Sequence, residues 1–150
     1  MNREKFMSEA LKLAEISYKN NDVPIGAVVV LNNEIVGSGY NRKELLKDAS
    51  EHAEIMALKN AAKHLETYHL EDCEMFVTLE PCAMCAGAII NFRLKKVYIG
   101  AKNPRFGCCG SNLNLLSHDF NHKTEVEFNI LEEECSKILS SFFSSIREKK

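Results

Sequence analysis

The chain has 150 residues, of which 45% are hydrophobic and 27% charged, and its formal net charge is −2. This length and composition are typical of one globular domain with a substantial core, so we expect a single domain over residues 1–150. The small negative charge excludes a globally basic surface for nucleic acid, and no apolar run approaches the roughly 20 residues that span a bilayer. The N-terminal segment does not resemble a signal peptide, so we expect a cytoplasmic protein with no membrane contact.

Hydrophobic periodicity and turn signals predict the elements in chain order. They are a helix over 3–20, strands over 26–31 and 34–40 joined by an Asn-Asn turn, a helix over 51–64, a strand over 75–79, a helix over 83–92, a strand over 97–100, a loop over 102–111, a strand over 126–130 and a helix over 132–147. This order predicts an α/β fold with three α-β-α layers around a mixed five-stranded sheet. The first pair of strands is expected to be antiparallel and later neighbours parallel.

Two short motifs carry the chemistry. They are His52-Ala53-Glu54 and Pro81-Cys82-Ala83-Met84-Cys85. One imidazole and two thiolates can hold zinc tetrahedrally and leave the fourth position to water, as in catalytic zinc sites. Zinc makes such a water acidic enough to supply hydroxide as a nucleophile near neutral pH, and the Glu54 carboxylate can shuttle protons. These groups suit hydrolytic attack on an amino-bearing ring carbon.

The spacing within each motif predicts where helices begin. Cys82 and Cys85 are three residues apart and share a face on a first helical turn, and a proline just before them suits a helix start. His52 and Glu54 are two residues apart and can converge only where a helix begins. Asp48 and Ser50 are candidate N-caps for that helix.

Each motif alone has other interpretations. A Cys-x-x-Cys pair could be a redox motif or half of a structural zinc site, and a His-x-Glu triplet alone means little. Together, in this order, they match the signature of zinc nucleobase deaminases. A fourth ligand from Cys108 or Cys109 is conceivable, but it would close the open position. We therefore expect the remaining cysteines to be free thiols, most of them buried: Cys73, Cys108, Cys109 and Cys135.

Any RNA binding must use local basic patches, because the net charge is −2. Three candidates are present, and charge alone gives RNA binding little support. They are Arg93, Lys95 and Lys96; Lys102 and Arg105; and Arg147, Lys149 and Lys150.

Over nearly its whole length the chain resembles the bacterial tRNA-specific adenosine deaminases (TadA type), within the cytidine deaminase-like superfamily. The resemblance rests on residues 23–28, 39–42, 52–58, 77–88, 110–116, 120–122, 131–135 and 142–143. It implies a cytidine deaminase-like fold and a homodimer in which the partner subunit helps to form each RNA site. It implies no other protein partner.

The resemblance also implies roles for individual residues. His52, Cys82 and Cys85 would bind one Zn²⁺ per subunit, and Glu54 would be the catalytic proton shuttle. Asn41 would contact the target base, and the backbone amide of Ala53 would face the flipped purine. The remaining substrate contacts to the tRNA anticodon stem-loop would be Lys102 and Asn103 in a loop, and Phe142, Phe143 and Arg147 on the last helix.

The leading hypothesis is hydrolytic deamination of adenosine to inosine at the wobble position of a tRNA anticodon. The alternative is a small-molecule deaminase of the same superfamily, acting on guanine, cytosine or a pyrimidine nucleotide. A third hypothesis, a non-catalytic zinc-stabilised RNA-binding module, is disfavoured because a structural zinc site needs no Glu54.

Three positions depart from the family pattern: Glu51, the Cys108-Cys109 pair, and Asn103, where the family usually has aspartate. An aspartate could accept a charge-assisted hydrogen bond from a ribose 2′-OH, so asparagine could weaken the discrimination of RNA from DNA. The other interpretation is that Asn103, just before Pro104, only shapes a turn.

Overall fold

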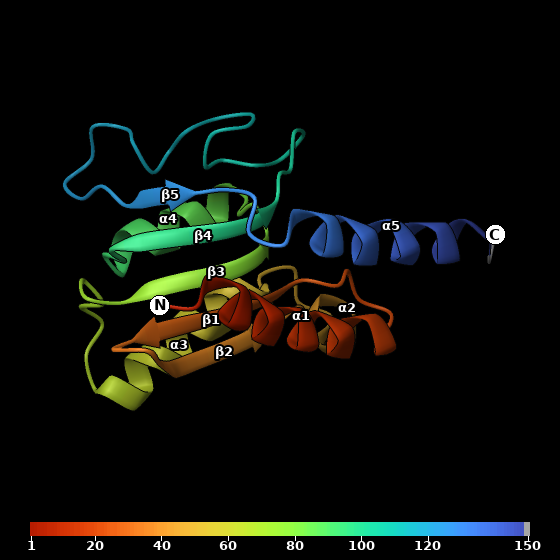
Figure 1. The fold of residues 1–150 in the computed structure, drawn as a ribbon, viewed down its shortest axis with the longest axis horizontal. Helices are drawn as coiled ribbons and strands as arrows, with labels where there is room; N and C mark the ends of the chain where they lie inside the picture. Colours follow the sequence, from red (N-terminus) through yellow and green to blue (C-terminus); the bar gives the residue numbers. More distant parts are fainter. Residues whose placement is uncertain (149–150) are drawn as a thin grey trace.

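The computed structural model describes residues 1–148 as a sheet covered by helices on both faces (Figure 1). The elements are α1 (Arg3–Lys19), β1 (Gly26–Leu31), β2 (Glu34–Tyr40), α2 (Lys43–Leu46), α3 (Ala53–Leu65), β3 (Glu74–Leu79), α4 (Ala83–Asn91), β4 (Lys96–Ala101), β5 (Glu125–Glu127) and α5 (Glu132–Glu148). Within these residues, no helix is long and apolar enough to cross a bilayer.

The sheet has five strands in the order β2-β1-β3-β4-β5. β1 pairs antiparallel with both β2 and β3, whereas β3–β4 and β4–β5 are parallel. The predicted mixed sheet is confirmed, including the antiparallel first pair. Because α4 connects the parallel strands β3 and β4, the segment after β3 emerges at the same edge of the sheet as the segment after β4.

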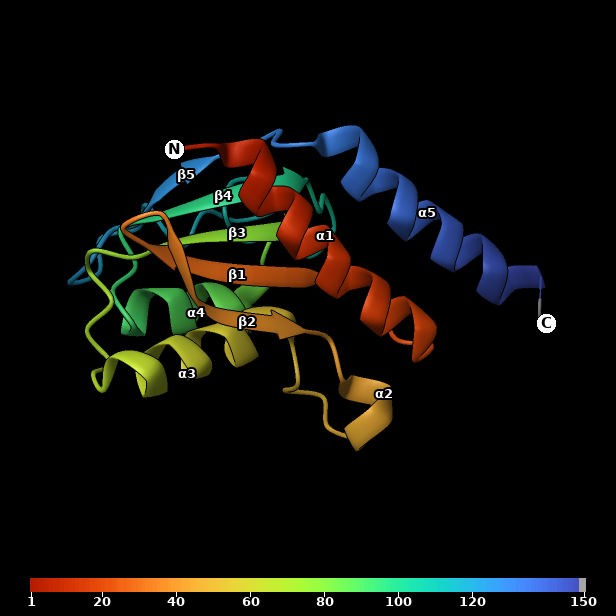
Figure 2. The same cartoon turned by 60° about the horizontal axis from the view of Figure 1, so that its bottom comes forward.

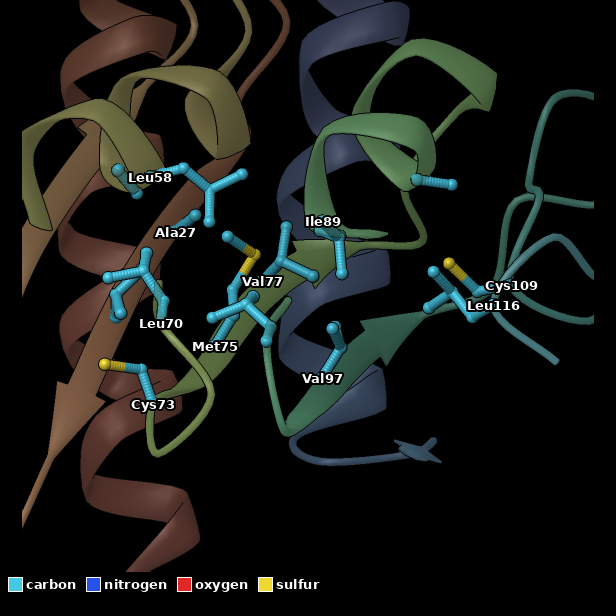
Figure 3. Close-up of a cluster of buried hydrophobic side chains, with 14 of the residues drawn as sticks. Ala27, Leu58, Leu70, Cys73, Met75, Val77, Ile89, Val97, Cys109 and Leu116 are labelled. Carbon is cyan, nitrogen blue, oxygen red and sulfur yellow. The ribbon is translucent and has the colours of Figure 1, made fainter. Parts of the chain in front are cut away.

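Two hydrophobic clusters form the core, one on each face of the sheet, and they confirm the predicted three layers. α3 and α4 cover one face, where Leu58 and Ile89 pack against Val77 of β3 (Figure 3). α1 and α5 lie on the other face (Figure 2), where Phe76 and Tyr98 stack with ring centroids 4.3 Å apart. The apolar run of β1 is buried because both of its faces are covered.

α3 lies unusually close to β2 because β2 contains two glycines at the contact. A Cβ at Gly37 would collide with the backbone of Ala57 and Ala61, and a Cβ at Gly39 with the backbone of Ala53 and Ala57. The absence of side chains at these two positions sets the distance between helix and strand.

Two details of the prediction were wrong. The helix α2 was not predicted, because four residues are too few to show a periodicity. It ends at Lys47, which has a left-handed φ of 54°. The last strand was expected over 126–130 but spans Glu125–Glu127, because the chain turns at Asn129 and Leu131, whose φ values are 71° and 54°.

Candidate active site

Two of the three predicted metal ligands are N-cap residues of helices. His52 is the N-cap of α3, Cys82 is the N-cap of α4, and Cys85 lies in the first turn of α4. The candidate caps Asp48 and Ser50 were wrong, because Ser50 bonds back to the Asp48 carboxylate in a local turn outside the helix. Helix N-termini carry partial positive charge, so the start of α4 favours the thiolate form of its two cysteines.

The three ligand atoms lie within 4.8 Å of one another. His52 Nδ1 is 3.7 Å from Cys82 Sγ and 3.4 Å from Cys85 Sγ. In a tetrahedral site with Zn–S of about 2.3 Å and Zn–N of about 2.0–2.1 Å, the N···S separation is about 3.6 Å. The residues therefore fit zinc. Among the described residues neither Cys108 nor Cys109 joins the group, so it supplies three protein ligands and not four.

The two thiols are electrostatically unequal. The hydrogen bond from Cys85, together with His52, lowers the pKa of Cys82 to about 3 despite partial burial. The pKa of Cys85 is raised, because its proton is shared with Cys82 and because it is buried. The hydrogen bond to Cys82 raises the pKa of His52. Cys82 is thus the most stabilised anionic donor of the group.

Glu54 lies in the first turn of α3 and is only 3% exposed. Burial raises the pKa of its carboxyl to about 7. Its Oε1 atom is buried and has no hydrogen-bond partner among the described residues. A carboxyl group of this kind can take up and release a proton near neutral pH.

His52, Glu54 and Cys82 open into one pocket of about 580 Å³. Its walls come from the segment before β1, the residue after β2, the end of β3, α2, α5 and the loop after β4. The other lining residues are Val23, Ile25, Asn41, Lys43, Leu79, Glu80, Asn103, Arg105, Phe106, Leu139 and Phe143. The pocket combines apolar walls with a few polar groups near the metal ligands, as small-molecule and base-binding sites do.

Asn41 and Ala53, both predicted to contact the base, are bonded to each other. Asn41 is 2% exposed, and its Oδ1 accepts a hydrogen bond of 2.9 Å from the Ala53 backbone N–H. Asn41 therefore caps α3 from the end of β2, and the Ala53 amide already has a partner. The Asn41 Nδ2 group remains as a donor.

The predicted turn role of Asn103 is present in the structure. Asn103 Oδ1 accepts a hydrogen bond of 3.2 Å from the Phe106 backbone N–H, and the residue also lines the pocket. The side-chain oxygen of Asn103 thus accepts a hydrogen bond from within the loop.

The structure brings only one of the three predicted contacts of the last helix into the pocket. Phe143 lines it, whereas Phe142 is buried edge-to-face against Tyr18 with centroids 5.4 Å apart. Arg147 bonds to Ser144 and does not line the pocket.

Among the basic candidates, Arg105 lines the pocket. Lys102 does not, because its ammonium lies over the Phe128 ring, 5.4 Å from the centroid. Lys149 and Lys150 lie outside the described residues.

Sequence reasoning gave no role to Glu80. This buried residue follows β3, lines the pocket and accepts hydrogen bonds from the loop after β4. One signal could have singled it out: an acidic residue directly between a buried strand and Pro81-Cys82.

Comparisons with known proteins agree with this site. A family model described as MafB19-like deaminase matches residues 1–147. The tRNA-specific adenosine deaminase of Bacillus subtilis (strain 168) is 45% identical over 148 residues, which cover 98% of this chain and 92% of that protein. The chain belongs to the tRNA-specific adenosine deaminase family.

Further relatives of the family support this placement. The tRNA-specific adenosine deaminase of Haemophilus influenzae is 42% identical, covering 98% of this chain and 86% of that protein. A structure from a study of A-to-I editing by tRNA:A34 deaminases at the wobble position of transfer RNA has a TM-score of 0.87 and 36% identity, covering 90% of this chain and 99% of that chain. The guanine deaminase of Bacillus subtilis has a TM-score of 0.64 and 38% identity, but covers only 68% of this chain and 66% of that chain.

Proposed function

We propose that this chain hydrolyses adenosine to inosine at the wobble position of a tRNA anticodon, releasing ammonia. The observation that carries the proposal is that the His52, Cys82 and Cys85 group and the buried Glu54 meet in one pocket. The tRNA substrate is supported by near-full-length relatives named tRNA-specific adenosine deaminase.

The side chains divide the chemistry between them. His52 and the two thiolates hold zinc, which when bound supplies the Lewis acidity that makes water a nucleophile near neutral pH. Glu54 Oε1 takes a proton from the attacking water and returns it to the leaving amine. Burial raises the pKa of this carboxyl to about 7, and a group with a pKa near neutrality suits both the uptake and the release of a proton.

The pocket positions the base. Asn41 Nδ2 donates to the purine, since Oδ1 is committed to Ala53. Ile25, Leu79 and Phe143 supply apolar contact. The target adenine must leave its stack to reach this depth, and a base in a single-stranded loop is the least costly to extrude.

The assembly belongs to the same proposal. A single domain over residues 1–150 acts in the cytoplasm as a homodimer with one zinc ion per subunit, and the partner helps to form each RNA site. Metal analysis and light scattering of the purified protein test the stoichiometry.

The test of function compares substrates. We expect inosine in a transcribed anticodon stem-loop with adenosine at the wobble position, and no product when guanosine replaces that adenosine. Ammonia release from guanine, cytosine or a pyrimidine nucleotide, without inosine in the stem-loop, would instead establish the small-molecule alternative. An RNA that binds but is never converted would favour the non-catalytic module.

A further inference from the structure

Glu80 is a buried carboxylate that the chemistry above does not use. It is 2% exposed and lies between the end of β3 and the metal-ligand turn that begins at Pro81. Burying a carboxylate is costly unless it is paired or hydrogen-bonded, and among the described residues Glu80 has no ion-pair partner. Hydrogen bonds must therefore satisfy its charge.

All four hydrogen bonds to Glu80 come from one loop, residues 102–111. Oε1 accepts from the Asn103 N–H at 3.1 Å and from the Ser111 hydroxyl. Oε2 accepts from the Cys109 and Ser111 N–H groups, both at 3.0 Å. Converging backbone N–H groups of this kind form a nest for an anion.

The loop packs tightly against the Glu80 carboxylate at Gly107. A Cβ at Gly107 would collide with the Glu80 carboxyl carbon and lie 2.6 Å from Oε2, so the loop closes tightly around the carboxylate. The same loop supplies Asn103, Arg105 and Phe106 to the pocket wall. Glu80 thus connects the end of β3, just before Cys82, to the loop that forms one wall of the pocket.

We propose that Glu80 is a positioning residue that holds loop 102–111 in place as the substrate-binding wall of the pocket. Its carboxylate acts on the loop and not on the reacting atoms. Losing it should therefore weaken substrate binding much more than it slows the chemical step. The kinetic part of this inference rests on the proposed function.

Glu80→Gln tests this role with little change of shape. An amide has only one acceptor oxygen, so its NH₂ group must face at least one backbone N–H, and that donor loses its partner. We expect the KM for the RNA stem-loop to rise about tenfold or more, because hydrogen bonds to charged groups are the stronger class. We expect kcat to change less than about threefold and zinc content to stay unchanged.

Two further variants calibrate the result. Ser111→Ala removes only the hydroxyl donor and should raise KM by a smaller factor, which keeps the inference testable if Glu80→Gln fails to fold. Glu127→Gln is the matched control, because this glutamate on β5 is held by Lys96 at 3.0 Å and Arg3 at 3.2 Å and does not line the pocket. It should leave KM unchanged.

Amide hydrogen exchange measures the loop without using activity. In Glu80→Gln, peptides covering 102–111 should exchange about tenfold faster or more than in the native protein, while those of α3 should not change. Unchanged loop exchange, or a fall in kcat at constant KM, would overturn the inference. If the native protein makes no inosine, the proposed function fails, and the exchange result still decides the role of Glu80.

Discussion

Asn41 Oδ1 accepts a hydrogen bond from the Ala53 backbone N–H at 2.9 Å, which ties the end of β2 to the first turn of α3. His52, the proposed metal ligand at the start of that turn, is therefore positioned by a residue eleven positions earlier. The Asn41 backbone is itself held, because its carbonyl accepts from the Ser17 hydroxyl at 2.9 Å.

Two substitutions separate the capping role of Asn41 from its role as a donor to the base. Asn41→Asp keeps an acceptor for Ala53 but removes the NH₂ group, so it should keep Tm within about 2 °C and lower kcat/KM about tenfold or more. Asn41→Ala removes both and should also lower Tm, since losing the side-chain acceptor of a first-turn helix N–H costs about 1 kcal/mol. Thermal unfolding and stem-loop kinetics measure the two effects. Equal activity of Asn41→Asp and the native protein would exclude the donor role.

Glu54→Ala should abolish turnover and keep zinc. General acid–base catalysis is worth about 10² to 10⁴-fold, and here one carboxyl serves two proton transfers. Elemental analysis and single-turnover inosine formation measure the two outcomes. If zinc is lost together with activity, Glu54 is a metal ligand and the shuttle role fails.

Cys82→Ser and Cys85→Ser should each lose zinc, activity and thermal stability. Both cysteines lie at the start of α4, so metal binding is coupled to the packing of that helix. Cys108→Ser is the matched control, because Cys108 is a buried thiol outside the ligand group, and it should retain zinc. A serine variant of either ligand with native zinc content would contradict the assignment.

The native protein should tolerate deoxyadenosine in the target loop better than Asn103→Asp does. The side-chain oxygen of Asn103 accepts a hydrogen bond from the Phe106 N–H. An aspartate would have a second carboxylate oxygen that could accept from a ribose 2′-OH. The charged acceptor should improve RNA-over-DNA discrimination about tenfold. Rates on RNA and DNA hairpins of identical loop sequence measure this. Equal ratios for the two proteins would leave Asn103 with the turn role alone.

RNA binding should be local and salt-sensitive. Neutralising Lys102, Arg105 and Arg147 together should raise the KM for RNA and flatten its dependence on salt, because phosphate contacts release counterions. Arg105→Ala alone should account for more of the effect than Arg147→Ala, since only Arg105 lines the pocket. KM is measured at several salt concentrations. Unchanged RNA kinetics in the triple variant would favour the small-molecule alternative.

The sequence predicted those features that side-chain chemistry or long periodicity encodes. The donor set of His52, Cys82 and Cys85 was visible because these residue types at these spacings are rare, and the long helices were visible from their apolar stripes. The acceptor for the first N–H of α3 was not, because Asn41 reaches Ala53 only through the fold. Glu80 was missed for a related reason. Its partners are mostly backbone N–H groups, which almost every residue type has, so the sequence does not indicate them.

The contact of α3 with Gly37 and Gly39 fixes the distance between α3 and the sheet. A single methyl group at Gly39 would press on the backbone of Ala53 and push the start of α3 away from the sheet. His52 would move with it, while Cys82 and Cys85 would stay with α4. A zinc site tolerates deviations of only about 0.2 Å in its metal–ligand distances. Gly39→Ala changes neither a proposed metal ligand nor a pocket residue, yet it should lower the affinity for the metal. The geometry of the metal site therefore restricts which residues β2 can carry where it contacts α3.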